Sequence, residues 1–363
     1  MSQTPLETVR SKYLLPGLVA ARIPANASKA VTQVVGVRKQ GNDTLITPND
    51  IFHLGSLTKA MTATLIAILI NDPTNNLTWD TTIPKALPEI LNLSPGYRNA
   101  TLAMLGSHFA GVNDSRLLET DFESWAIIRN ETVSPITGRR LVAEKALSAP
   151  PSTNPGSNYE YSNAGYMILG HLIDTHVCGG WEKFIQRSLW RPLGMARCGF
   201  GPAPQRTLES IDNPWPHSPG NPAVPVRPDR LSDNPPALGP AGTVHCDVPS
   251  YAKFLSFHLG GLLGRDSPLL NATDFKRLHT PYLGPRKNAT IASSYTSGGW
   301  IVKSDSRVNG TYLLHDGSNG FNYAYAVVAP GVNESYFTAT NVGGEGARIG
   351  LNEVLIGVFN HTI

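Results

Sequence analysis

Cysteine is scarce in this chain, with three residues in 363, and their spacing fits no common cysteine motif. Cys178, Cys198 and Cys246 include no C-x-x-C pair, which excludes a zinc ribbon and a thioredoxin-like site. The histidines show no H-E-x-x-H spacing, so we predict neither a metal nor a cofactor. One disulfide could form, and Cys178–Cys198 is the nearer pair along the chain, but the sequence leaves the pairing open.

Long apolar runs and blocks of one charge are also missing. The longest apolar run, Ala63 to Ile70, is interrupted by Thr64 and is far too short to span a membrane. A net charge of +3 without a basic run predicts no nucleic-acid partner. The hydrophobic fraction of 41% and mean hydropathy of -0.14 are typical of a soluble globular protein with room for a large core.

The N-terminus lacks a targeting signal, because residues 1–5 are not a basic region followed by an apolar one. Asn-x-Ser/Thr sequons are nevertheless in excess: 12 of 25 asparagines begin one, where composition predicts about four. They begin at Asn26, Asn42, Asn76, Asn92, Asn99, Asn113, Asn130, Asn271, Asn288, Asn309, Asn333 and Asn360. We predict a secreted, N-glycosylated protein whose signal peptide has been removed; unused sequons are the alternative.

The order of expected elements places strands at both ends of the chain and helices between them. The expected strands are 17–23, 30–38, 299–303, 311–315, 321–328 and 335–341. The expected helices are 57–70, 101–109, 166–176, 181–193, 249–263 and 347–359. We therefore predict an α/β domain formed by residues 1–75 and 250–363, and a mainly helical insert over residues 76–249.

Residues 201–240 differ in composition from the rest of the insert. Proline makes up 11 of these 40 residues, which predicts an irregular loop or a linker. Trp215, His217 and several arginines lie within it. A lid over a cleft and a plain structural loop are both consistent with this composition.

Residues 51–71 hold the pattern around which the rest is organised. From Leu57 to Ile70, apolar residues fall on every side of a helical wheel, which predicts a helix buried in a large core. Ser56 and Lys59 lie three residues apart at its start and therefore on one face. A buried lysine is costly unless its charge is partnered or its pKa is lowered. A desolvated lysine of this kind can act as the base that activates a serine nucleophile.

Short motifs of this type also occur by chance. Ser250 and Lys253 repeat the Ser-x-x-Lys spacing, where an N-cap serine and a solvated lysine suffice as an explanation. The same N-cap interpretation stays open for Ser56. Two further motifs are Tyr161-Ser162-Asn163, in a loop before a helix, and His315-Asp316-Gly317, at the end of a strand. Their other copies are Tyr97-Arg98-Asn99, His53-Leu54-Gly55 and His258-Leu259-Gly260.

Order along the chain separates these copies, because only Ser56, Tyr161 and His315 give a helix start, a loop and a strand edge in succession. In these three motifs the chain resembles the serine β-lactamase-like superfamily of penicillin-recognising enzymes, which includes class C β-lactamases, D-alanyl-D-alanine carboxypeptidases and related esterases. Supporting stretches are Ser107 to Gly111, Glu160 to Gly170, Pro192 to Met195, Pro240 to Thr243 and Gly298 to Trp300. The resemblance implies an α/β fold of the β-lactamase/transpeptidase type. Its antiparallel sheet is flanked by helices, with an all-helical inserted domain and the site in the cleft between.

The resemblance also implies a role for each motif. Ser56 would attack a carbonyl carbon and form an acyl-enzyme, with Lys59 and Tyr161 sharing the work of the general base. Asn163 would orient Lys59 and the substrate amide. The backbone N–H groups of Ser56 and Ser318 would form the oxyanion hole. Simpler interpretations remain: Tyr161 as a core tyrosine, and Asn163 as a helix N-cap.

His315 is a departure from the family pattern, since β-lactamases carry a lysine there that helps to hold the substrate carboxylate. With Gly317 and Ser318 it would line the substrate-binding site, although a solvent-facing histidine is an alternative. An imidazole beside Asp316, whose negative charge we expect on the same strand edge, is a weak anion site. This favours ester, lactone or amide chemistry over β-lactam hydrolysis.

The prediction is therefore a serine hydrolase that acts through a Ser56 acyl-enzyme on a small-molecule or peptide substrate. An acyltransferase that passes the acyl group to a small-molecule acceptor is the near alternative. A non-catalytic binding protein on the same fold belongs to a different class. Retention of Ser56, Lys59 and Tyr161 together with Asn163 favours the enzyme, because a binding protein needs no such set.

Overall fold

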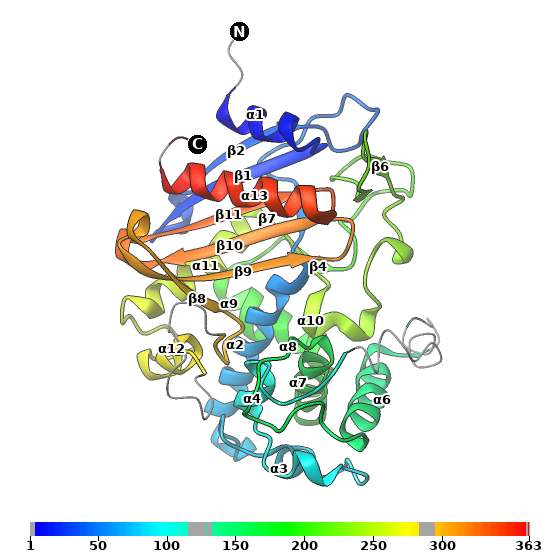
Figure 1. The fold of residues 1–363 in the computed structure, drawn as a ribbon, viewed down its shortest axis with the longest axis vertical. Coiled ribbons are helices and arrows are strands. Elements are labelled where there is room, and N and C mark those ends of the chain that lie inside the picture. Colours follow the sequence, from blue (N-terminus) through cyan, green and yellow to red (C-terminus); the bar gives the residue numbers. More distant parts are fainter. Residues whose placement is uncertain (1–3, 115–128, 130–132, 283–294, 361, 363) are drawn as a thin grey trace.

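A six-stranded antiparallel sheet built from both ends of the chain forms one side of the molecule (Figure 1). The computed structural model describes residues 4–114, 129, 133–282, 295–360 and 362. The strands, in the order β2-β1-β11-β10-β9-β8, are Val31–Gly36, Gly17–Pro24, Glu334–Thr340, Tyr323–Ala329, Gly310–Ser318 and Ile301–Asp305. The sequence prediction of an α/β fold with an antiparallel sheet from both termini is confirmed.

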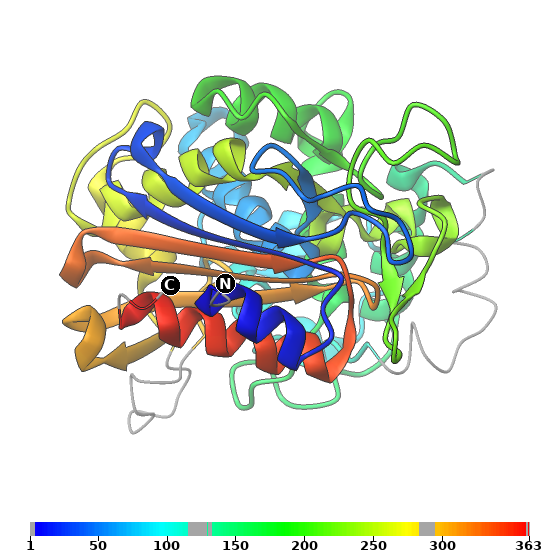
Figure 2. The same ribbon diagram turned by 90° about the horizontal axis from the view of Figure 1, so that it is seen from above.

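Helices cover both faces of this sheet, as Figure 2 shows from above. Helices α1 (Pro5–Lys12) and α13 (Gly344–Phe359) pack on one face, and α11 (Val248–Leu262) packs on the other. Alternate residues of each strand enter different cores: on β9, Leu313 belongs to the core that contains α11, and Leu314 to the core that contains α13. This alternation decides the direction of the functional residues at the end of β9.

The predicted buried helix is α2 (Thr58–Asn71), which passes through the centre of the molecule. It follows a 3₁₀ turn, η2 (Gly55–Leu57), that carries Ser56. Helix α2 contacts α7 (Asn163–His176) and the short helix α10 (Gly239–Gly242). No side chain caps the start of α2 or of η2, so the N-cap interpretation of Ser56 is wrong.

The remaining helices surround α2. They are α3 (Ile83–Ala86), α4 (Leu102–Gly106), α6 (Pro135–Ser148), α8 (Gly180–Ile185), α9 (Arg191–Leu193) and α12 (Ala272–His279). The predicted helix 181–193 is interrupted by a π-helical turn at Gln186–Trp190. The buried guanidinium of Arg139 joins α6, α7 and α8 through Asp174, at 2.7 Å, and Glu182, at 2.7 Å. Within the described residues, no helix combines the length and apolar character that a membrane crossing needs.

A second, three-stranded sheet lies beneath the start of α2. Its order is β3-β7-β4, with β3 at Ile51–His53, β7 at Val244–Asp247 and β4 at Cys198–Phe200. Two of these strands come from the segment predicted as a helical insert, where no alternating pattern is strong enough to predict them. The proposed boundaries at 76 and 249 stay a prediction, because this sheet joins segments from both sides of them.

The strand pairing in this small sheet also determines which cysteines form the disulfide. Cys198 of β4 lies directly opposite Cys246 of β7, with 4.1 Å between the Cα atoms, and the two are bonded. Cys178 is free and exposed. The preference for Cys178–Cys198 is therefore wrong, because strand pairing rather than separation along the chain decides which thiols meet.

The proline-rich segment 201–240 is packed onto the body of the protein. The backbone N–H of Trp215 donates to the carbonyl oxygen of Arg38 at 2.8 Å, and the imidazole of His217 contacts the carbonyl oxygen of Asn341 at 2.8 Å. Both side chains are buried. The segment is therefore a structural loop rather than a linker, and it brings Asp233 against His53 of β3.

Candidate active site

The hydroxyl of Ser56 lies at the centre of a hydrogen-bonded group. Lys59 Nζ lies 2.9 Å from Ser56 Oγ, and the Tyr161 hydroxyl donates to the same oxygen at 2.7 Å. Lys59 Nζ also donates to Asn163 Oδ1 at 2.8 Å and to the carbonyl oxygen of Ala241 at 2.7 Å. The structure thus brings together two pairs of residues, Ser56 with Lys59 and Tyr161 with Asn163, that lie more than a hundred positions apart in the sequence.

Lys59 is fully buried in the first turn of α2, one turn after Ser56. Desolvation by this burial lowers the pKa of Lys59 to about 7, against the opposing effect of the carboxylates of Asp114 and Asp316. A substantial fraction of the amine is therefore neutral near pH 7. A neutral amine 2.9 Å from a hydroxyl can accept its proton.

Tyr161 is held in the opposite protonation state. Its side chain is 37% exposed, but its hydroxyl points inward to Ser56, and burial is the main cause that raises the pKa of Tyr161 well above the usual range. The phenol therefore keeps its proton at neutral pH and acts as a hydrogen-bond donor.

Two glycines allow the backbone of Ser56 to approach the end of β9. Gly55 has φ +51, and a Cβ atom there would lie 2.4 Å from the backbone nitrogen of Ser318. A Cβ atom at Gly317 would lie 2.6 Å from the backbone nitrogen of Ser56. The nitrogen atoms of Ser56 and Ser318 therefore belong to two backbone segments in direct contact, as the predicted pair of oxyanion donors requires.

His315 is buried rather than exposed to solvent, so the solvent-facing alternative is wrong. Its side chain is buried, and burial lowers the pKa of His315 to about 4, although Asp316 opposes the shift. Nδ1–H donates to the carbonyl oxygen of Asp316, and Nε2 accepts from the Tyr295 hydroxyl. His315 is thus a neutral imidazole with both nitrogen atoms engaged.

Asp316 lies on the other face of the sheet. Its carboxylate accepts a hydrogen bond from Tyr323, which belongs to the core under α13. Consecutive strand residues point to opposite faces, so the Asp316 carboxylate turns away from His315, but its negative charge lies on the same strand edge, as expected, and opposes the lowering of the His315 pKa. Its charge still acts through the sheet and favours the protonated form of Lys59.

Asp114 and His108 support the site, and sequence reasoning gave neither of them a role there. The Asp114 carboxylate accepts from the backbone N–H of Asn163 at 2.6 Å and of Ala164 at 2.9 Å, which fixes the start of α7. His108, predicted as structural, accepts from the Ser162 N–H at 3.0 Å and packs against the ring of Tyr161. Asp114 lies in none of the quoted motifs, and the supporting stretch Ser107 to Gly111 contains His108 without giving it a role at the site, because each residue acts through a contact about fifty residues distant in sequence.

The duplicate motifs serve the fold. Asp247, not Ser250, caps α11 by accepting the Ser250 N–H at 2.9 Å, so the N-cap interpretation of Ser250 is wrong by one helical turn. Lys253 donates to the carbonyl oxygen of Gly194. Tyr97 is buried in the core, and His258 is paired with His279.

The part of the chain that the structure describes contains no group of three or more His, Cys, Asp or Glu side chains placed to hold a metal ion. The geometry of the site is that of side-chain acid–base groups around a serine. This arrangement can carry out acyl transfer to and from Ser56 with the chain's own residues.

Comparison with known proteins agrees with the fold. The chain is 25% identical over 355 residues to "Unguisins hydrolase ungD'" of Aspergillus campestris, which covers 91% of this chain and 59% of that protein. It is 24% identical over 351 residues to "Penicillin-binding protein 4" of Amycolatopsis lactamdurans, which covers 94% of this chain and 84% of that one. The solved D-stereospecific amidohydrolase from Streptomyces sp. superimposes with a TM-score of 0.70 at 19% identity, covering 95% and 97% of the two chains.

These similarities extend over the whole architecture rather than a single motif. The chain spans little more than half the length of the Aspergillus relative, whose name therefore describes a longer protein. The family known as Beta-lactamase matches residues 8–355, and that range contains the site around Ser56. Since the match covers nearly the entire sequence, the chain belongs to the Beta-lactamase family.

Proposed function

We propose that this protein is a serine hydrolase that cleaves an ester, lactone or amide bond through an acyl-enzyme on Ser56. The observation that carries this proposal is the position of Ser56 Oγ within hydrogen-bonding distance of both Lys59 Nζ, at 2.9 Å, and the Tyr161 hydroxyl, at 2.7 Å. A protein that only binds a ligand has no need to bury a lysine with a lowered pKa beside a serine.

The protonation states suggest how the steps divide. Neutral Lys59 accepts the Ser56 proton while Oγ attacks the substrate carbonyl carbon, and the backbone N–H groups of Ser56 and Ser318 stabilise the oxyanion. Tyr161 donates a proton to the leaving alcohol or amine and recovers one from the Lys59 ammonium. Water then adds to the acyl-enzyme by the same steps in reverse and releases the acid. This refines the predicted sharing of base work, because Lys59 is the base and Tyr161 the proton donor in acylation.

The names of two similar proteins favour small-molecule amides and peptides as substrates of this protein. A hydrolase of unguisins and a D-stereospecific amidohydrolase both have names that fit such substrates. Acyl transfer to a small-molecule acceptor would use the same acyl-enzyme and differ only in what attacks it. A panel of esters, lactones and D-amino-acid amides, run on the wild type and on Ser56→Ala in parallel, tests the proposal.

Penicillins should be poor substrates because of His315. A carboxylate held by a charged donor gains about 1.5–3 kcal/mol, whereas the imidazole here is neutral and has both nitrogen atoms engaged. We expect kcat/KM for short-chain activated esters to exceed that for any penicillin by at least about tenfold. His315→Lys should narrow the gap. Faster turnover of penicillins than of esters by the wild type would show that another residue supplies an anion site.

Secretion and glycosylation are also proposals, and the surface supports them. Of the twelve sequon asparagines, ten lie in the described residues, and nine of these ten are exposed. Asn113 is the half-buried one, and its amide nitrogen donates to Glu160 at 2.7 Å. The Cys198–Cys246 disulfide is typical of oxidising compartments.

Expression in a eukaryotic host behind a signal sequence should therefore give a protein whose mass falls on enzymatic removal of N-glycans. We expect several occupied sites, because nine of the described sequons are exposed. Asn76→Gln should reduce the shift, whereas Asn113→Gln is the matched control and should leave it unchanged. An unaltered mass in such a host would refute secretion as the natural route.

A further inference from the structure

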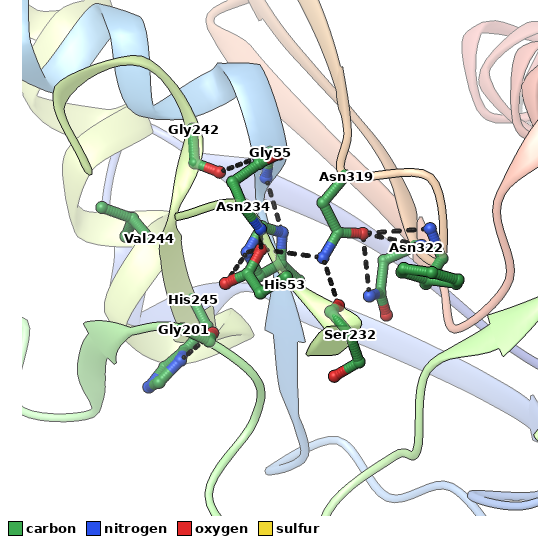
Figure 3. Close-up of polar contacts among 12 residues, drawn as sticks. His53, Gly55, Gly201, Ser232, Asn234, Gly242, Val244, His245, Asn319 and Asn322 are labelled. Carbon is green, nitrogen blue, oxygen red and sulfur yellow. Dashed lines mark hydrogen bonds and ion pairs between the residues drawn. The ribbon is translucent and has the colours of Figure 1, made fainter. Parts of the chain in front are cut away.

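We propose that Asp233 is a positioning residue that holds the two backbone segments of the oxyanion hole together, through His53 on one side and Asn319 on the other. Figure 3 labels His53 and Asn319. The inference rests on the proposed function, because it assigns a role within the same reaction. Asp233 touches neither Ser56 nor Lys59 in any contact described above, and it acts through its two neighbours.

The first connection runs through His53, the last residue of β3. The Gly55 N–H donates to His53 Nδ1 at 3.1 Å, so the ring carries its proton on Nε2. Nε2–H faces both carboxylate oxygens of Asp233, at 2.9 and 3.0 Å. Asp233 thereby fixes the tautomer of His53. His53 in turn fixes the N–H group of Gly55, the residue before Ser56.

The second connection runs through Asn319, which follows Ser318. Asn319 Nδ2 donates to the Asp233 carboxylate at 3.0 Å. Its Oδ1 accepts from the backbone N–H of Asn322 at 3.0 Å, and Ser318 Oγ donates to the carbonyl oxygen of Asn322 at 2.7 Å. Asn319 therefore fixes the turn after β9 that carries the backbone nitrogen of Ser318.

The two connections meet at a point where only a carboxylate fits. The side chains of His53 and Asp233 are each 2% exposed, and the carboxylate faces three donors: His53 Nε2–H, Asn319 Nδ2 and the backbone N–H of Asn234 at 2.7 Å. Burying a charge is costly, and such groups are kept where they enforce one specific arrangement. The arrangement enforced here is the contact between Gly55 and Ser318.

A third link extends the same group toward Lys59. Asn234 Nδ2 donates to the carbonyl oxygen of Gly242 at 2.9 Å, and Figure 3 shows Asn234 lying between Gly242 and His53. The carbonyl oxygen of Ala241, the preceding residue, accepts from Lys59 Nζ. The loop that carries Asp233 is thus hydrogen-bonded to three segments that flank the catalytic serine, through His53, Asn319 and Gly242.

The test compares Asp233→Asn with the matched control Asp50→Asn. Because His53 Nε2–H lies within 3.0 Å of both carboxylate oxygens, an amide at 233 places its NH2 group against that donor in either orientation. Since loss of one oxyanion donor costs about 10²–10³ in kcat, displacement of one should lower kcat at least about tenfold with little change in KM. Asp50 is equally buried and is bound by Arg38 at 2.6 Å, so Asp50→Asn should lower the melting temperature but keep kcat within about threefold.

Infrared spectroscopy of a trapped acyl-enzyme measures the stretching wavenumber of its carbonyl group, which a change in stability alone does not alter. A carbonyl group held by both N–H donors absorbs at a lower wavenumber, so the band should shift upward in Asp233→Asn and stay in place in Asp50→Asn. Should Asp233→Asn not fold, Asn319→Ala and His53→Asn break the two connections separately and should each raise the wavenumber. If all act in one path, Asn319→Ala should add little to the loss caused by Asp233→Asn.

Failure of the proposed function can be distinguished from failure of the positioning role of Asp233. Absence of a fluorophosphonate adduct on the wild type would overturn the proposed function, and this inference with it. A normal wild-type adduct combined with a kcat and carbonyl band in Asp233→Asn equal to those of Asp50→Asn would overturn the positioning role alone. The same holds if Asn319→Ala and His53→Asn both retain the wild-type band.

Discussion

Ser56→Ala should remove turnover of every ester, lactone and amide substrate to below measurable rates while the fold survives. The substitution deletes the atom that both Lys59 and Tyr161 contact, and no covalent route remains without it. Ser56 caps no helix, so the loss of its hydroxyl removes only its contacts with those two side chains. Steady-state kinetics and a thermal melt of the same preparation give both results.

The second Ser-x-x-Lys copy supplies the control for this experiment. Ser250 is buried, and its hydroxyl accepts a hydrogen bond from the backbone N–H of Arg197 at 3.1 Å. It lies in α11 and does not belong to the hydrogen-bonded group around Ser56. Ser250→Ala should leave kcat/KM within about threefold of wild type, the scatter expected for a substitution outside the site. Activity of Ser56→Ala within about tenfold of wild type would sink the assignment of the nucleophile.

Lys59→Met should have the next largest effect, a fall of at least about a hundredfold in kcat/KM, as expected for loss of a general base. The wild-type rate should rise with pH through about 7, where Lys59 loses its proton, and this limb should vanish in the variant. Lys253→Met, the corresponding change in the second copy, should retain the limb. A wild-type profile that is flat between about pH 6 and 8 would contradict Lys59 as the base.

The same substitution should change the pH dependence of stability. The pKa of Lys59 is about 7 in the folded protein and near its ordinary 10.5 in the unfolded chain. Between these values the unfolded state binds one more proton, so the free energy of unfolding of the wild type rises with pH over this window. Below about pH 7 both states are protonated, and the cost of the buried charge is constant. Lys59→Met should remove this slope, which denaturant titrations at pH 6, 8 and 10 would show.

Much of this site could be predicted, because its residues belong to short motifs next to helices and strands that have clear sequence patterns. The apolar pattern after Leu57 predicts a buried helix, and that burial is what gives Lys59 its altered pKa. The turns and strand edges that carry Tyr161 and His315 also stand out by their position in the order of elements. In these cases a local pattern and a long-range contact point to the same conclusion.

The remaining parts depend on contacts that no local pattern encodes. Asp114 and Asp233 reach the site from loops, through hydrogen bonds to residues far away in sequence. The disulfide follows from the pairing of β4 with β7, two strands of four residues or fewer that alternation cannot reveal. The direction of Asp316 follows from the pleat of β9, which the sequence pattern leaves undecided until the cores on both faces are known.

The most direct test of the central claim is the intact mass of the protein after treatment with a fluorophosphonate, followed by mapping of the modified peptide. We expect one added phosphonyl group, located at Ser56, on both the wild type and Ser250→Ala, and none on Ser56→Ala. A wild-type protein that gains no mass, or one whose adduct lies on a residue other than Ser56, would contradict it.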